Sequence, residues 1–216
     1  MPDSAHLAAF AIAAITIALI PGPGMLYVLA RSLGGGRTAG IRSSYGTAIG
    51  GLVHVVAAAV GLSAIIAASA AAFTVVKYAG AAYLIWLGVR ALFLSDHQPP
   101  AISVEPGDVT PGALRQGIIT EALNPKTALF FLTFLPQFCD PSAGPLALQM
   151  VVLGTVSVAL NTGADVVVAL GAGQISERLR TRPRAWRRQQ IATGSLLVGL
   201  GVFAAASGHR ATATTR

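Results

Sequence analysis

Charged residues are scarce in this 216-residue chain. Only 11% of the residues are Asp, Glu, Lys or Arg, whereas a soluble domain carries about 25%. Hydrophobic residues make up 54% of the chain, and its mean hydropathy is +0.67. A soluble domain of this composition could not cover its surface with polar groups and would aggregate. The composition therefore excludes a disordered chain and most soluble enzymes, and it favours a protein that crosses a membrane several times.

Cysteine and catalytic sequence patterns are also nearly absent. The single cysteine, Cys139, cannot form an internal disulfide, and it matches no metal-ligand spacing. The sequence has no Walker motif, dinucleotide-binding fingerprint, zinc-ligand cluster or serine nucleophile elbow. We therefore expect no cofactor, no metal and no enzymatic activity, and the pattern argues against ATP-driven transport within this chain.

Long stretches without charged residues predict membrane-spanning helices, because about 20 apolar residues are needed to cross a hydrocarbon core of about 30 Å. Six spans can be placed, with a tight hairpin near Ala68 to Ala72 between the second and the third. The fourth reaches the required length only if it includes the more polar stretch from Ile118 to Lys126. The expected spans are 7–30, 45–67, 73–94, 118–139, 146–173 and 189–208.

Basic residues are distributed unevenly between the two sides of the predicted bundle. Most of the 15 Lys and Arg residues fall in the first, third and fifth connecting loops. Because such residues are enriched in cytoplasmic loops, we expect these loops to lie in the cytoplasm and both termini outside. The basic run in the fifth loop lies directly between two spans, so we expect it to face the lipid surface rather than nucleic acid. The loop residues are Arg31, Arg37, Arg42, Arg90, Arg115, Arg178, Arg180, Arg182, Arg184, Arg187 and Arg188.

Two segments that lie 104 residues apart are similar. Residues 15–21 read ITIALIP and residues 119–125 read ITEALNP, with a weaker match between 84–89 and 197–202. If three spans repeat, the second copy enters the membrane from the opposite side, as in many transporters. The predicted fold is therefore an all-α integral membrane protein of six transmembrane helices in a 3+3 inverted repeat. The predicted parts are 1–94, a cytoplasmic linker 95–112, 113–208 and a C-terminal tail 209–216.

Both repeated segments end on a proline in the middle of a predicted span. Proline has no amide hydrogen and disrupts a helix, so helices one and four are expected to break at residues 21–24 and 124–126. A helix that restarts inside the membrane presents free N–H groups and the positive end of its dipole, which attract a carboxylate. The alternative is that both prolines only kink closely packed helices. The predicted substrate-binding residues are Pro21, Gly22, Pro23, Gly24, Asn124, Pro125, Lys126 and Asp165.

Few ionisable residues lie within the predicted spans, where a central charge costs about 2.5–3.5 kcal/mol. Asp165 is a candidate for binding a substrate ammonium or carrying a proton, with a structural hydrogen bond as the alternative. His54 titrates near neutral pH if it is accessible, so it is a second candidate proton relay, with a packed neutral histidine as the alternative. Glu121 is expected to form a local ion pair with Lys126 or Arg115.

Glycine is abundant within the predicted spans, where small residues let helices approach closely. We interpret these glycines as packing positions rather than as ligand-binding ones. They are Gly46, Gly50, Gly51, Gly61, Gly80, Gly88, Gly194, Gly199 and Gly201.

A set of motifs occurs in a fixed order along the chain. They are Pro-Gly-Pro at 21–23, GAAYLIWLG at 80–88, Asn-Pro-Lys at 124–126, Phe-Phe at 130–131 and Leu-Pro-Gln-Phe at 135–138. From about residue 10 to 203, the chain resembles the lysine exporter / homoserine–threonine exporter (LysE/RhtB) family of bacteria. The resemblance implies a multi-pass protein of the cytoplasmic (inner) membrane that exports amino acids or close derivatives, driven by the proton gradient. Its signature positions here are Pro21, Gly22, Pro23, Asn124, Pro125 and Lys126.

The resulting hypothesis is a secondary transporter, an antiporter, for a small zwitterion. The substrate carboxylate would meet the N–H groups at Gly22 and Gly24 and the Lys126 ammonium, and the substrate ammonium would meet freed carbonyls, Asn124 or Asp165. The expected partners are an amino acid and the lipid bilayer, with a homo-oligomer also compatible. Two alternatives stay open. A cation transporter or channel would use Asp165 and Glu121 as ligands, and a membrane-embedded enzyme or assembly subunit would need a catalytic constellation that the sequence lacks.

Overall fold

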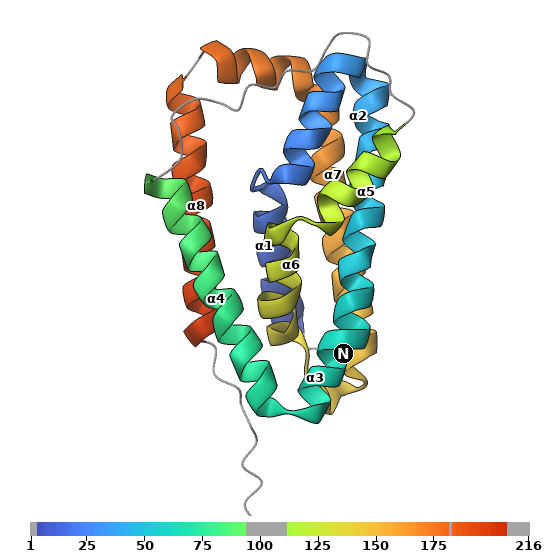
Figure 1. Ribbon diagram of the computed structural model, residues 1–216, viewed down its shortest axis with the longest axis vertical. Coiled ribbons are helices and arrows are strands. Elements are labelled where there is room, and N and C mark those ends of the chain that lie inside the picture. Colours follow the sequence, from blue (N-terminus) through green and yellow to red (C-terminus); the bar gives the residue numbers. More distant parts are fainter. Residues whose placement is uncertain (1–3, 94–111, 182, 207–216) are drawn as a thin grey trace, which may run out of the picture.

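The computed structural model describes residues 4–93, 112–181 and 183–206. In these three stretches the regular structure is entirely helical, without a strand (Figure 1). The predicted tail, 209–216, and all but residue 112 of the predicted linker lie outside the described residues. The predicted division into four parts therefore stays a prediction.

The helices lie on either side of residues 94–111, which are outside the described residues. The first half has α1 (Ser4–Leu19), α2 (Pro23–Ala57), the π-helical turn η1 (Ala58–Leu62), α3 (Ser63–Ala68) and α4 (Ala70–Phe93). The second half has α5 (Ala113–Ala122), α6 (Pro125–Leu129), the short turns η2 (Phe130–Phe134), η3 (Leu135–Phe138) and η4 (Pro141–Ala143), α7 (Leu146–Thr181) and α8 (Pro183–Ala206).

Helix α2 changes direction at Gly36, within the first predicted loop. Gly36 has φ 76° and ψ 179°, in the middle of an otherwise helical segment. Glycine adopts this backbone conformation without the steric cost that other residues meet. Figure 1 shows the darker blue part of α2 rising to a turn and the lighter part descending beyond it. Helix α2 is therefore two helices in space, one before and one after Gly36.

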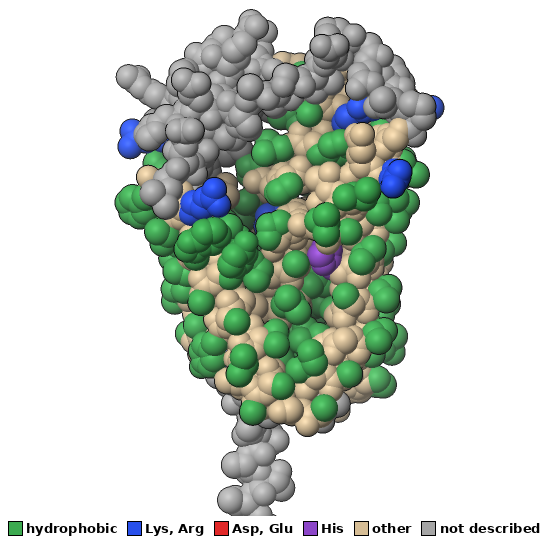
Figure 2. Space-filling view, viewed as in Figure 1, with side chains coloured by type: hydrophobic (Ala, Val, Ile, Leu, Met, Phe, Trp, Pro, Cys, Tyr) green, Lys and Arg blue, Asp and Glu red, His purple; other side chains and the backbone are tan. Residues whose placement is uncertain are grey.

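Several helices are long and apolar enough to cross a membrane. Among the described residues these are Pro23–Ile66, which contains the turn at Gly36, Ala71–Arg90 and Leu146–Gln174. Ala113–Ala122 and Pro125–Phe138 pass the same test together, with a bend of 42° between them. Figure 2 shows a surface on which hydrophobic side chains dominate and basic side chains gather toward the end where α2 turns. The protein is thus a helical membrane protein, and the number of six spans stays a prediction.

Two connections can be compared with their predictions. The break between α3 and α4 falls at Ser69, within the predicted hairpin, and Ser69 Oγ accepts a hydrogen bond from the Ala72 amide. The fifth loop was expected between the spans that end at 173 and begin at 189, and in this stretch α7 continues to Thr181 and α8 begins at Pro183. The segment contains six Arg, which favours helix, so loss of apolar character does not end the helix there.

Glycines bring the helices of the bundle close together. A Cβ atom on Gly50 would lie 2.5 Å from the Ile118 carbonyl oxygen, and one on Gly88 would lie 2.6 Å from the Gly194 carbonyl oxygen. The pairs α2–α5 and α4–α8 therefore approach at backbone distance. The expectation was wrong for Gly61 and Gly199, because a Cβ atom there would meet no atom within 4 Å.

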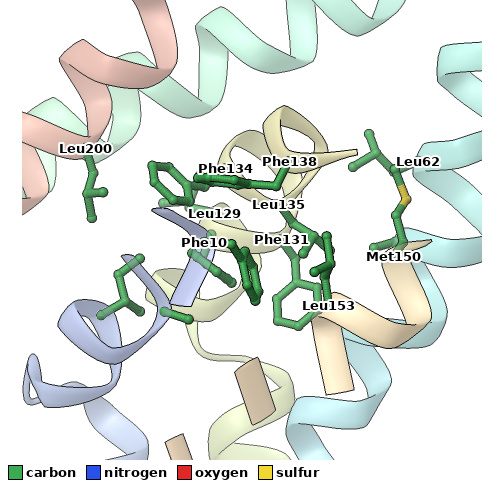
Figure 3. Packing of buried hydrophobic residues seen from close by; sticks show 14 of the residues in the cluster. Phe10, Leu62, Leu129, Phe131, Phe134, Leu135, Phe138, Met150, Leu153 and Leu200 are labelled. Carbon is green, nitrogen blue, oxygen red and sulfur yellow. The ribbon is translucent and has the colours of Figure 1, made fainter. Parts of the chain in front are cut away.

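An aromatic core holds α1 against the second broken segment. The Phe10 ring lies 5.4 Å from the Phe138 ring and 6.4 Å from the Phe130 ring. Figure 3 shows Phe10 packed among side chains of η2 and η3, including Phe131 and Phe134. Burial of these large side chains is a dominant packing contribution. It places the end of α1 beside the start of α6, where the candidate site lies.

Candidate functional site

The two proline segments lie at helix ends that meet in space. Helix α1 ends at Leu19 and α2 begins at Pro23, with Gly22 extended between them at φ −121° and ψ −178°. In the second half, α5 ends at Ala122 and α6 begins at Pro125. A Cβ atom on Gly22 would lie 3.1 Å from Cε of Lys126. The two predicted segments therefore form one cluster.

Lys126 binds the carbonyl groups at the end of α1. The Ile17 carbonyl would normally accept from the amide of Pro21, which has no hydrogen. It accepts instead from the Ile20 amide at 3.1 Å and from Lys126 Nζ at 3.3 Å. Lys126 Nζ also donates to the Ile20 carbonyl at 2.9 Å, and the side chain is buried. A cation is favourable here, since the C-terminal end of a helix is its negative end.

The equivalent carbonyl in the second half has an equivalent arrangement. Glu121 lies 104 residues after Ile17, and its backbone carbonyl faces the missing amide of Pro125. It accepts from the Asn124 amide at 3.0 Å and contacts His54 Nε2 at 3.0 Å. A carbonyl can only accept, so Nε2 must carry a hydrogen in this contact. His54 thus supports the broken helix, as Lys126 does in the other half.

The Glu121 side chain occupies the centre of the cluster. Its Oε2 accepts from Asn124 Nδ2 at 2.9 Å and its Oε1 accepts from Thr127 Oγ1 at 2.6 Å. A Cβ atom on Gly24 would collide with Oε2, so the carboxylate lies beside the start of α2. The expected ion pair with Lys126 or Arg115 is not found among the described residues. Lys126 instead reaches across to α1, where the freed carbonyls attract it.

Asn124 caps the restarted helix α6. Its Oδ1 accepts from the Lys126 amide at 3.0 Å, and the residue is 1% exposed. Capping by Asn satisfies an amide that the helix itself leaves free. The amide side chain is therefore shared between the start of α6 and Glu121. It holds the Glu121 carboxylate in place while it also orients the backbone at Lys126.

Asp165 is attached to the cluster through Thr47. Its side chain is fully buried, and Oδ2 lies 2.8 Å from Thr47 Oγ1. The same hydroxyl lies 2.9 Å from the Ser44 carbonyl oxygen. Because a hydroxyl has only one hydrogen, it can donate to only one of these two oxygens at a time. Asp165 Oδ1 has no hydrogen-bond partner. Thr47 also lies beside the start of α2, because its Cγ2 would be 3.5 Å from a Cβ atom on Gly24.

A small cavity lies next to this cluster. About 20 Å³ of it is open to the centre of a water molecule, which suffices for about one ordered water. An amino acid would fit only after the helices separate. The polar residues that line it are Thr47, Glu121, Thr127, Ser157, Asn161 and Thr162, and the apolar ones include Ile17, Phe130, Phe131 and Val158.

The structure brings the predicted residues of both proline segments into one place and attaches Asp165 and His54 to it through one contact each. Thr47 and Thr127 were not singled out from the sequence, and Glu121 was assigned only a local ion pair. A helix-face argument could have found Thr47, since it lies seven residues before His54 on the same face.

Comparison with known proteins gives the family. The family described as LysE type translocator matches residues 15–208. A homoserine/homoserine lactone efflux protein of Salmonella typhimurium is 30% identical, over 93% of this chain and 96% of its own length. A leucine efflux protein of Enterobacter sp. strain 638 is 28% identical, over 88% and 90%.

A membrane protein of Vibrio cholerae without an assigned function is 31% identical, over 91% of this chain and 95% of its own length. No solved structure matches the chain. The family match extends over both halves and includes both proline segments. This chain belongs to the LysE type translocator family of membrane transporters, and it is not an enzyme.

Proposed function

We propose that this protein is a proton-coupled antiporter that exports an amino acid or a close derivative across the cytoplasmic (inner) membrane of a bacterium. The observation that carries the proposal is the meeting of two interrupted helices in one buried polar cluster. Helix breaks inside a membrane require partners for the freed backbone groups, and they line substrate sites in transporters. Two relatives named for amino-acid efflux support the substrate class.

We propose six spans in a 3+3 inverted repeat. The first span comprises α1 and α2 up to Gly36, and the fourth comprises α5, α6, η2 and η3. The Ile17 and Glu121 carbonyls lie 104 residues apart, and each accepts a hydrogen bond from a side chain of another helix, which supports this assignment. The pairings of α2 with α7 and of α4 with α8 also relate corresponding spans of the two halves.

The substrate carboxylate is proposed to bind at the start of α2. Pro21, Gly22 and Pro23 interrupt the helix, and the first amides of α2 precede its first hydrogen bond, from the Leu26 amide to the Gly22 carbonyl. The Lys126 side chain passes within contact distance of Gly22 and adds a positive charge at that point. In the second half, Asn124 and Pro125 restart α6 and orient Lys126.

Both termini are proposed to lie outside the cytoplasm, as the distribution of basic residues predicts. A cysteine introduced at Thr212, in a variant in which Cys139 is serine, should react with a membrane-impermeant maleimide added to intact cells. A cysteine at Arg42, on the opposite side, should react only after the membrane is opened. The reverse pattern would contradict the orientation.

Transport by purified protein in proteoliposomes tests the proposal as a whole. A pH gradient imposed across vesicles that contain labelled leucine or homoserine should drive substrate movement against the proton flow. Competition among the twenty common amino acids should then identify the preferred substrate. Divalent cations assayed in parallel test the alternative of a cation transporter. Cation flux without amino-acid flux would overturn the proposal.

A further inference from the structure

We propose that Glu121 binds the ammonium group of the substrate and that the site selects amino acids with an uncharged side chain. This inference rests on the proposed transport of amino acids. It replaces the ion pair expected for Glu121 with a direct contact to the transported molecule.

The hydrogen bonds of Glu121 leave room for a cationic ligand. A carboxylate has about four lone-pair positions, and the protein supplies one neutral donor to each oxygen, from Asn124 and Thr127. No ion pair to Glu121 is found among the described residues, although the side chain is only 2% exposed. Lys126 is near enough to interact with Glu121 electrostatically, but no described cation contacts the carboxylate directly, and a buried charge in that position is costly. An ammonium, with three donors, would supply both the missing charge and further hydrogen bonds.

The position of Glu121 suits the geometry of an α-amino acid. The carboxylate lines the cavity and lies beside Gly24, at the positive end of α2. A substrate carboxylate that binds the first amides of α2 must displace Glu121 from that helix end. The ammonium of the same molecule is one carbon atom away, so the displaced Glu121 remains within reach of it. Glu121 thus occupies the anion site only while the substrate is absent.

The rest of the cavity indicates the kind of substrate side chain. Ile17, Phe130, Phe131 and Val158 give it apolar walls, and its other polar groups are neutral hydroxyls and one amide. Among the described lining residues, Glu121 is the only charged one. A second positive charge on the substrate would compete with its own ammonium for Glu121. A negative side chain would meet no cation among the described lining residues, and Lys126 would already face the carboxylate of the amino acid itself. An apolar or hydroxylated substrate side chain carries neither a second positive charge nor a negative charge, so it suits this cavity.

Binding of substrate analogues to the purified full-length protein tests the contact. Labelled leucine is bound in detergent and displaced by leucinamide, which keeps the ammonium, or by N-acetyl-leucine, which keeps only the carboxylate. We expect leucinamide to displace leucine. N-acetyl-leucine should bind at least about tenfold more weakly than leucine, as loss of a charge-assisted hydrogen bond predicts. Homoserine should compete well, whereas lysine and glutamate should not.

Glu121→Gln should lower leucine affinity by about tenfold to a hundredfold and leave N-acetyl-leucine affinity unchanged. The variant keeps an oxygen that can accept from Asn124 or Thr127. Asp140→Asn is the matched control, since Asp140 is an exposed acidic residue away from the cavity, and it should bind leucine normally. If Glu121→Gln fails to fold, the analogue series on the wild-type protein still decides.

Three results would overturn the inference. They are equal binding of N-acetyl-leucine and leucine to the wild-type protein, normal leucine affinity in a folded Glu121→Gln variant, and lysine that competes as well as leucine. Its failure is distinguishable from failure of the proposed function. If wild-type proteoliposomes move no amino acid, the proposed function fails. If they transport leucine while Glu121→Gln binds it normally, only the role of Glu121 fails.

Discussion

Lys126→Met should remove most transport and also lower the thermal stability of the protein. Two buried carbonyls at the end of α1, those of Ile17 and Ile20, would lose their shared donor. The Ile17 carbonyl would keep the Ile20 amide, whereas loss of the donor to the Ile20 carbonyl should cost about 1–3 kcal/mol, as for an unsatisfied buried polar group. The substrate carboxylate would lose its nearest cation as well, which should weaken affinity by about tenfold to a hundredfold. Thermal unfolding in detergent and leucine binding measure the two effects on the same sample.

Lys126→Arg should restore stability better than affinity, because the planar guanidinium keeps donors for the carbonyls but needs different space. Arg115→Gln removes an exposed charge from the neighbouring α5 and serves as the control for loss of charge alone. A methionine variant with normal unfolding would show that Lys126 does not hold α1. Normal affinity in that variant would remove Lys126 from the substrate site.

Asp165→Asn should abolish proton-driven transport while substrate exchange at equal pH continues. A protonated Asp165 can donate to Thr47, which then donates to the Ser44 carbonyl, so every hydrogen is used. When Asp165 is ionised, the Thr47 hydrogen turns to it and the Ser44 carbonyl loses this additional hydroxyl donor. Asparagine resembles the protonated form of Asp165, but it cannot take up or release a proton. Charged groups with an electrostatic effect on Asp165 are Glu121 on α5 and Lys126 on α6.

His54→Gln is the comparison for the second candidate relay. Glutamine keeps a donor for the Glu121 carbonyl, so the structural contact can persist. Normal pH-driven transport in this variant, together with its loss in Asp165→Asn, would assign the coupling proton to Asp165. The assay is leucine efflux from proteoliposomes with and without a pH gradient. Normal pH-driven transport in Asp165→Asn would exclude Asp165 as the coupling group.

The sequence by itself determined the helical membrane character and the family, and it predicts an interruption at each proline segment. These properties depend on local chemistry. A run of apolar residues identifies a membrane-spanning helix whatever packs against it in the fold. A proline lacks an amide hydrogen wherever it lies in the chain. The helix boundaries at Pro23 and Pro125 accordingly fall within the predicted segments.

Tertiary structure alone decided what the buried charges contact. Lys126 and Glu121 lie five residues apart, so sequence spacing favoured a pair between them. The aromatic core around Phe10 brings the end of α1 beside α6, and the freed carbonyls there accept from Lys126 instead. Glu121 is left beside Gly24 and the cavity, and Asp165 meets Thr47 from 118 positions earlier in the chain. A side chain bonds to the groups that packing places near it, and those groups come from segments whose approach no local pattern encodes.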